Sequence, residues 1–186
     1  MISRKPSDYT NARRRLLKGF ALAPFGLARA PAALAAADRA LAFRHTHTGE
    51  RLEIVYFSRG EYLPAALARV DWLLRDFRTG DVRTMDRRLL DALHTLSASS
   101  GSAIEVISGY RSPKTNAQLH KASSGVAVHS LHLEGRAIDV RLPGMHTAKL
   151  RDAALALGVG GVGYYPKSDF VHLDTGRVRH WGPQSA

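Results

Sequence analysis

Ser130-Leu-His-Leu-Glu-Gly-Arg-Ala-Ile-Asp139 is the stretch of this 186-residue chain that most constrains its fold and chemistry. Polar and apolar residues alternate around the centre of segment 136–142, which predicts a strand. Asp139 interrupts the apolar centre of this strand. Charged side chains are rarely buried without a partner, so Asp139 either faces solvent or meets a cation. Taken alone, a solvent-facing aspartate is the more common arrangement.

A second segment, Asp169-Phe-Val-His-Leu-Asp174, carries His172 within another apolar strand. Together, His132, Asp139 and His172 offer two imidazoles and one carboxylate, and the chain contains no cysteine. Such a set suits zinc, and three protein ligands leave the fourth tetrahedral position to water, as in catalytic rather than structural zinc sites. His/Asp sets also accept other divalent ions, so the metal's identity stays open at this point.

Apolar periodicity and turn residues predict an α+β fold, with N-terminal helices packed on a small, mostly antiparallel sheet that carries the zinc site. Strands are expected at 52–57, 103–108, 136–142, 160–165 and 170–174, the last two as a hairpin. Helices are expected from Pro64 towards Gly80, from Thr84 or Asp86 to Leu96, from Pro113 to about Lys121, and over 147–157. The glycines at 160, 161 and 163 lack the Lys-Ser/Thr of a phosphate loop, so we interpret them as a tight turn and a close backbone approach.

The first residues are typical of an export signal. Arg13-Arg-Arg-Leu-Leu-Lys18 precedes a short apolar run, and Ala33-Leu-Ala35 is a suitable cleavage site. The paired arginines resemble a bacterial twin-arginine signal, which implies the twin-arginine export machinery as a partner and the periplasm as the destination; an ordinary Sec signal or an uncleaved anchor is the alternative. The apolar run is shorter than the roughly 20 residues of a membrane span, so no stable span is expected. We therefore assign 1–37 to the signal and 38–186 to a single domain.

The positive charge of the chain is concentrated in this signal. The formal net charge is +11, and residues 1–35 contribute seven basic residues and one acidic residue to it. The remainder, with 20 basic and 15 acidic residues, carries +5. A moderately basic surface suits an anionic polymer such as the cell wall, whereas no clustered basic run or nucleic-acid motif is present, so nucleic-acid binding is not expected.

Several motifs together resemble one enzyme family. The pattern S-x-H-x-x-G-x-A-x-D is complete in 130–139, and an H-x-D pair follows at His172 and Asp174. Ser108-Gly-Tyr-Arg-Ser112 and Gly160-Gly-Val-Gly-Tyr-Tyr-Pro166 extend the likeness over nearly the whole chain after the signal. These segments resemble the M15-like (LAS) zinc peptidases, most closely the murein endopeptidase K subgroup. The resemblance implies a zinc peptidase that acts on the peptide stems of peptidoglycan.

The resemblance also assigns the metal ligands. It implies that His132, Asp139 and His172 bind one zinc ion. His129 is the local alternative, because H-x-x-H spacing can put two rings on one helix face. We favour His132, since it alone has a serine two residues before it and a glycine three residues after it.

Other roles follow from the same resemblance. Arg111 is expected beside the zinc, where its guanidinium can stabilise a developing oxyanion and hold substrate. Tyr110 and Ser130 are further candidates for substrate binding, although Ser130 could instead position the His132 loop. Asp169, three residues before His172, is the provisional general base; a turn-capping role is the alternative.

Two further residues are expected near the metal ligands without binding the metal themselves. Asp174 shares a strand face with His172, because side chains two apart point the same way, and could orient that ring or cap the following turn. His180 could line the cleft. The functional prediction is an endopeptidase that cleaves D-Ala–meso-diaminopimelate and diaminopimelate–diaminopimelate cross-links. A D-Ala-D-Ala carboxypeptidase and a zinc-retaining, non-catalytic wall-binding module are the alternatives.

Overall fold

The computed structural model describes residues 37–98, 100–123 and 126–183. The predicted signal lies almost entirely outside these residues, so its assignment stays a prediction. Among the described residues, no helix combines the length and the apolar character needed to cross a membrane.

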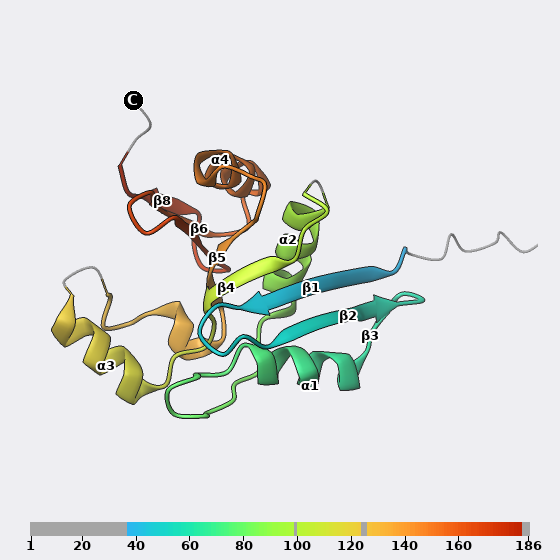
Figure 1. The fold of residues 1–186 in the computed structure, drawn as a ribbon, viewed down its shortest axis with the longest axis horizontal. Coiled ribbons are helices and arrows are strands. Elements are labelled where there is room, and N and C mark those ends of the chain that lie inside the picture. Colours follow the sequence, from blue (N-terminus) through green and yellow to red (C-terminus); the bar gives the residue numbers. More distant parts are fainter. Residues whose placement is uncertain (1–36, 99, 124–125, 184–186) are drawn as a thin grey trace, which may run out of the picture. The chain divides into compact units, whose positions relative to one another are not determined.

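The described strands form one eight-stranded sheet with the order β3-β2-β1-β4-β5-β7-β6-β8, which confirms the predicted α+β class (Figure 1). Neighbouring strands are antiparallel except for the parallel pairs β1–β4 and β6–β8. The strands are β1 (Arg39–His45), β2 (Arg51–Ser58), β3 (Glu61–Tyr62), β4 (Ile104–Ser108), β5 (Ala137–Arg141), β6 (Gly161–Tyr165), β7 (Phe170–Asp174) and β8 (Arg179–Trp181). The helices are α1 (Pro64–Leu73), α2 (Arg87–Ser97), α3 (Pro113–Ala122) and α4 (Thr147–Leu157), with a 3₁₀ turn, η1 (Leu131–Glu134).

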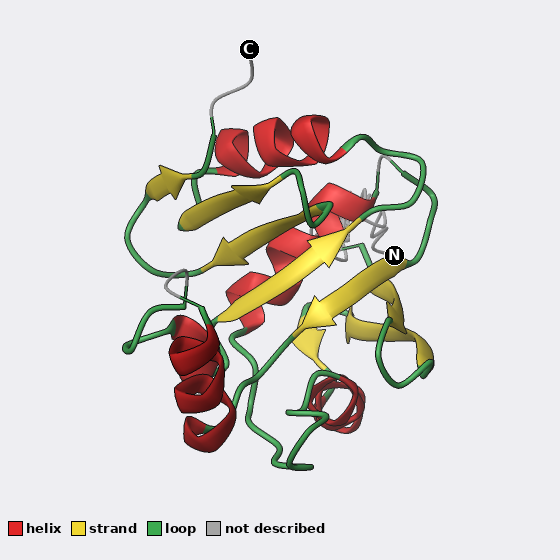
Figure 2. Cartoon of the chain, turned by 60° about the vertical axis from the view of Figure 1, so that its left-hand side comes forward, coloured by secondary structure: helices red, strands yellow, loops and turns green. Residues whose placement is uncertain are grey.

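The two faces of the sheet serve different purposes. Residues alternate between faces along each strand, so Ile138 and Val140 of β5 join the hydrophobic core while Asp139 points to the other face. Apolar side chains of the neighbouring strands and of helices α1, α2 and α4 complete this core, and Figure 2 shows a helix running behind the central strands. The face opposite the core is therefore free to carry polar chemistry.

Helix α2 illustrates how the core side is built. Its four leucines, Leu89, Leu90, Leu93 and Leu96, recur at helical spacing and are all buried. Asp86 begins the helix, because its side chain accepts a hydrogen bond from the backbone N–H of Arg88 at 3.0 Å. The predicted choice of Thr84 or Asp86 as cap is thus resolved in favour of Asp86.

Two expectations about the elements need correction. Helix α1 ends at Leu73 rather than continuing towards Gly80. The carbonyl of Leu74 accepts the N–H of Tyr110 instead, and the side chain of Asp76 captures the N–H of Arg78 in a turn. Strands β1, β3 and β8 were not predicted, because β3 and β8 are too short to show a period and β1 follows the Ala/Pro-rich stretch.

Glycines on β6 allow β8 to contribute to the polar face. A Cβ atom on Gly161 would lie 2.2 Å from Arg179 Nη1, and one on Gly163 would lie 2.6 Å from the ring of Trp181. Because both positions lack side chains, Arg179 and Trp181 extend across β6 towards β7. The predicted close backbone approach occurs instead at Gly160, where a Cβ would lie 2.0 Å from the carbonyl oxygen of Asp174, and the predicted tight turn is wrong for Gly161 and Gly163, which lie within β6.

Substitution of Gly135 tests the packing of the turn that carries His132. Gly135 has φ +69°, and a Cβ there would lie 2.3 Å from the carbonyl oxygen of Thr84. Gly144 has a similar φ of +84° but nothing within 4 Å. Left-handed backbone costs an alanine about 1–2 kcal/mol at either position, and the steric clash adds about 1–3 kcal/mol at Gly135 alone. Denaturant unfolding should therefore show Gly135→Ala to be clearly less stable than Gly144→Ala; equal losses would contradict this packing.

Candidate metal centre

His132 is fixed by the short turn that contains it. Ser130 begins η1, and its Oγ accepts a hydrogen bond from the backbone N–H of His132 at 3.4 Å. The Nδ1 atom of His132 lies 2.6 Å from the carbonyl oxygen of Gly109. Since a carbonyl can only accept, Nδ1 carries the proton, and the neutral ring presents the lone pair of Nε2 to the polar face of the sheet.

Asp139 and His172 are opposite each other on neighbouring strands. The register of β5 and β7 pairs these two residues directly. The Nδ1 atom of His172 lies 2.9 Å from Asp139 Oδ1, and its Nε2 lies 3.1 Å from Asp174 Oδ2. The carboxylate of Asp174 thus accepts from Nε2–H, which leaves the Nδ1 lone pair facing the same point as His132. Asp174 Oδ1 also accepts the N–H of Gly176 at 2.8 Å, so the contacts for both roles considered for Asp174 are present.

The three ligand atoms are spaced for a single metal ion. His132 Nε2 is 3.2 Å from His172 Nδ1 and 3.3 Å from Asp139 Oδ1, and the third side of the triangle is 2.9 Å. Ligands about 2.0–2.1 Å from a tetrahedral zinc ion lie about 3.3 Å apart, so little rearrangement is needed to accept one. Their side chains are buried. His132, Asp139 and His172 are therefore positioned to bind a metal.

An arginine accompanies each carboxylate at the centre. Arg111 contacts Asp139 Oδ2 through Nη2 and donates from Nε to Ser108 Oγ at 2.9 Å. Arg179 forms a fork with Asp174, with Nη1 at 3.0 Å from Oδ1 and Nη2 at 2.7 Å from Oδ2. The positive charges of Arg111 and Arg179 offset the negative charges of Asp139 and Asp174. The charge of a bound divalent ion would therefore act mainly on a substrate group that enters the hollow from solvent.

Protonation states at the centre follow from these contacts. Burial favours a raised pKa for Asp139 and Asp174, but the neighbouring histidines, together with Arg179 for Asp174, hold both pKa values below the usual range. Burial lowers the pKa of His132. Burial also acts to lower the pKa of His172, yet hydrogen bonds with Asp139 and Asp174 outweigh it and raise that pKa. Both carboxylates are thus ionised at neutral pH, as metal ligation requires.

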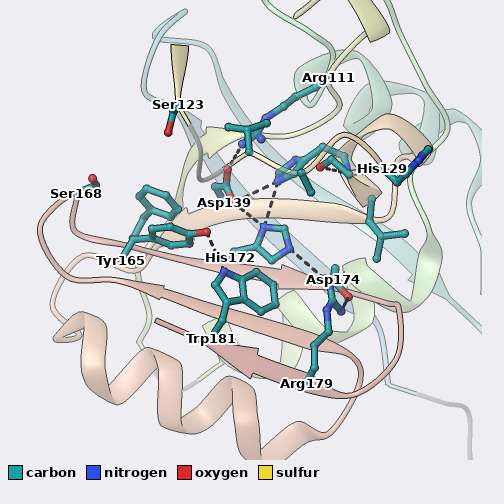
Figure 3. Close-up of a pocket in the computed structure, with 16 residues that line it drawn as sticks. Arg111, Ser123, His129, Asp139, Tyr165, Ser168, His172, Asp174, Arg179 and Trp181 are labelled. Carbon is teal, nitrogen blue, oxygen red and sulfur yellow. Dashed lines mark hydrogen bonds and ion pairs between the residues drawn. The ribbon is translucent and has the colours of Figure 1, made fainter. Parts of the chain in front are cut away.

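The ligands lie at the floor of a hollow of about 480 Å³ (Figure 3). Its lining includes Arg111 and Ser130, two of the predicted substrate-binding residues, as well as Asp174. His129 also lines the hollow, but it is exposed and is not part of the ligand triangle. A substrate molecule that entered the hollow from solvent would therefore reach the metal position directly.

Three predicted site residues lie elsewhere. Asp169 has a φ of +51° and turns away, accepting hydrogen bonds from Thr147 Oγ1 and from Arg141 at 3.3 Å. Tyr110 is buried in the hydrophobic core. His180 is exposed on the opposite face of β8 and borders a separate hollow beside α4. The structure therefore does not bring the predicted base to the metal centre.

Several residues that line the hollow were not predicted, and three of them contact one another or the ligating side chains. Arg179 and Trp181 come from β8, and Tyr165 comes from the end of β6. The Nε1–H of Trp181 donates to the hydroxyl oxygen of Tyr165 at 2.9 Å. Alternation along Arg179-His180-Trp181 would have placed the first and third of these on the face opposite His180, had the strand itself been recognised.

A buried ligand set that remains accessible from an open hollow is the arrangement of metal-dependent hydrolases, in which substrate must reach the ion. Comparison with known proteins makes the class specific. The family model described as peptidoglycan L,D-endopeptidase MepK, of the M15 peptidases, matches residues 33–181. The chain therefore belongs to this family, as its motifs predicted.

Individual relatives agree with the family match. The probable peptidoglycan L,D-endopeptidase MepK of Haemophilus influenzae is 44% identical over 146 residues, which cover 77% of this chain and 78% of the relative. The peptidoglycan L,D-endopeptidase MepK of Escherichia coli K12 is 41% identical over 145 residues, covering 77% and 80% of the two chains.

Replacement of Asp174 by asparagine tests its support of His172. The carboxylate of Asp174 accepts hydrogen bonds from His172 Nε2–H, from Arg179 and from two backbone N–H groups. The side-chain amide of asparagine has only one acceptor oxygen, so it cannot accept all of these hydrogen bonds. Loss of such a supporting group typically lowers metal affinity about 10- to 100-fold, which competition with a chelator would measure. Asp152→Asn is the matched control, because Asp152 is exposed on α4 and pairs with Arg151. Equal affinities of both variants would rule out the supporting role.

Proposed function

We propose that the protein is a zinc-dependent murein endopeptidase that hydrolyses peptide cross-links of peptidoglycan, namely the D-Ala–meso-diaminopimelate and diaminopimelate–diaminopimelate bonds. The observation that carries this proposal is the convergence of His132, Asp139 and His172 at the floor of an open hollow. The family membership and the names of the two relatives, both peptidoglycan endopeptidases, support the substrate class.

Zinc is the proposed ion, because two imidazoles and one carboxylate at tetrahedral spacing match its catalytic sites. When bound, it supplies Lewis acidity to the amide that is to be cleaved. The chain's own contribution is orientation: Gly109 fixes the ring of His132, and Asp174 fixes that of His172. Arg111 lies beside Asp139 at the hollow, where its remaining N–H groups can hold a substrate oxygen.

We further propose that residues 1–37 direct export by the twin-arginine route and that 38–186 form a single periplasmic domain. Paired arginines, a short apolar run and the Ala33-Leu-Ala35 site support this assignment. Twin-arginine export carries folded proteins, so the metal could be acquired before the protein leaves the cytoplasm. The peptidoglycan substrate would be met in the periplasm.

Digestion of purified sacculi tests the activity. The zinc-loaded protein should convert cross-linked muropeptide dimers to monomers, as seen by chromatography of the products. A chelator should abolish the conversion, added zinc should restore it, and His132→Ala should lack it because one ligand is missing. Loss of terminal D-Ala alone would show a carboxypeptidase instead, and binding of sacculi without turnover would show a non-catalytic module.

Asp169→Asn tests the general-base role that the sequence suggested. Since Asp169 faces Thr147 and Arg141 rather than the hollow, the variant should keep a kcat/KM close to that of the wild type on muropeptide dimers. Asparagine tolerates the left-handed backbone of this position, so folding should be preserved. Removal of a true general base costs about 100- to 10,000-fold, and a loss of that size would return Asp169 to the mechanism.

A further inference from the structure

The side chain of Tyr165 offers a hydrogen-bond donor to the hollow. An indole N–H can only donate, so the 2.9 Å contact from Trp181 Nε1 makes the phenolic oxygen of Tyr165 the acceptor. The phenolic hydrogen is then left without a partner among the described residues. Figure 3 shows the Tyr165 hydroxyl directed towards His172, beside the ligand cluster.

The ring that carries this hydroxyl is held in place. Tyr165 stacks on Phe170 with a centroid distance of 4.6 Å and an interplanar angle of 18°. Trp181 is itself fixed, since its ring packs over Gly163, lies 5.1 Å from the ring of His172 and is covered by the Arg179 guanidinium at 4.8 Å. The donor is therefore pre-organised, which limits the entropy lost when it binds a partner.

Tyr165 and Arg111 flank the ligand cluster from opposite sides. The strand order β4-β5-β7-β6 places Arg111, which follows β4, on one side of Asp139 and His172, and Tyr165 of β6 on the other. Both residues line the same hollow. A peptide that crosses the metal position would thus meet a donor before it and a donor after it.

We propose that the Tyr165 hydroxyl donates a hydrogen bond to a non-reacting backbone carbonyl oxygen of the bound cross-linked peptide, on the β8 side of the metal position. This inference rests on the proposed function, and it makes Tyr165 a substrate-binding residue. A peptide carbonyl is the matching group, because it is an acceptor without a donor of its own. A substrate that continues on both sides of the scissile bond, as a cross-link does, can use both flanking donors.

Kinetics of Tyr165→Phe on purified cross-linked muropeptide dimers test the proposal with the zinc-loaded protein. The variant keeps the stacked ring and loses only the hydroxyl. A donor to a non-reacting group stabilises ground state and transition state alike, so KM should rise roughly 10-fold while kcat stays nearly unchanged. The Kd for a dimer whose scissile amide is replaced by a non-hydrolysable CH₂–NH linkage should rise by the same factor.

Tyr164→Phe is the matched control. Tyr164 lies next in sequence but faces the opposite side of β6, under the guanidinium of Arg151 at 4.6 Å, so KM and Kd should not change. Unchanged KM and Kd in Tyr165→Phe, or a fall in kcat alone, would overturn the proposal while leaving the proposed function intact. A wild-type protein that neither cleaves nor binds the dimers would overturn the proposed function and this inference with it.

A double-mutant cycle separates the hydrogen bond from general packing. Trp181→Phe removes the N–H that holds the phenolic oxygen, so it should raise KM in the wild-type background more than in Tyr165→Phe. The same increase in both backgrounds would show that Trp181 acts on the hollow without Tyr165, and would refute the pre-organised donor.

Discussion

The register between β5 and β7 is the constraint on which the metal centre depends. It sets Asp139 opposite His172 and, on the other face, Ile138 opposite Leu173 and Val140 opposite Val171. A slip of one residue would exchange the faces of one strand, so apolar side chains would enter the hollow and a charge would enter the core. Core packing therefore enforces the pairing of Asp139 with His172, while η1 and the carbonyl of Gly109 set the third ligand, His132.

Much of this arrangement could be predicted from local signals. Alternation in 136–142 and 170–174 gave the two strands, and caps and glycines gave α2, α3 and α4 close to their observed bounds. The spacing within Ser130–Asp139 singled out His132 over His129, and the structure places only His132 in the triangle. These predictions are correct because each depends only on residues that are close together in the sequence.

The remaining features depend on contacts between distant segments. Arg179 and Trp181 matter because the glycines of β6 let them reach β7, which no local pattern of Arg179–Trp181 reveals. Asp169 was misplaced for a simpler reason. It lies in the turn before β7 with a left-handed backbone, which directs its side chain to Thr147 and Arg141, and spacing from His172 alone does not reveal that conformation.

The edge position of β8 has a consequence for how firmly an ion would be retained. β8 is the last strand in the sheet order and pairs with β6 alone among the described strands. It carries Arg179, which pairs with Asp174, and Trp181, which packs beside His172. Short edge elements open locally more readily than the core unfolds, and detachment of β8 would remove both supports while leaving the three ligating residues on η1, β5 and β7. An ion would therefore escape by fraying of this edge rather than by unfolding of the whole domain.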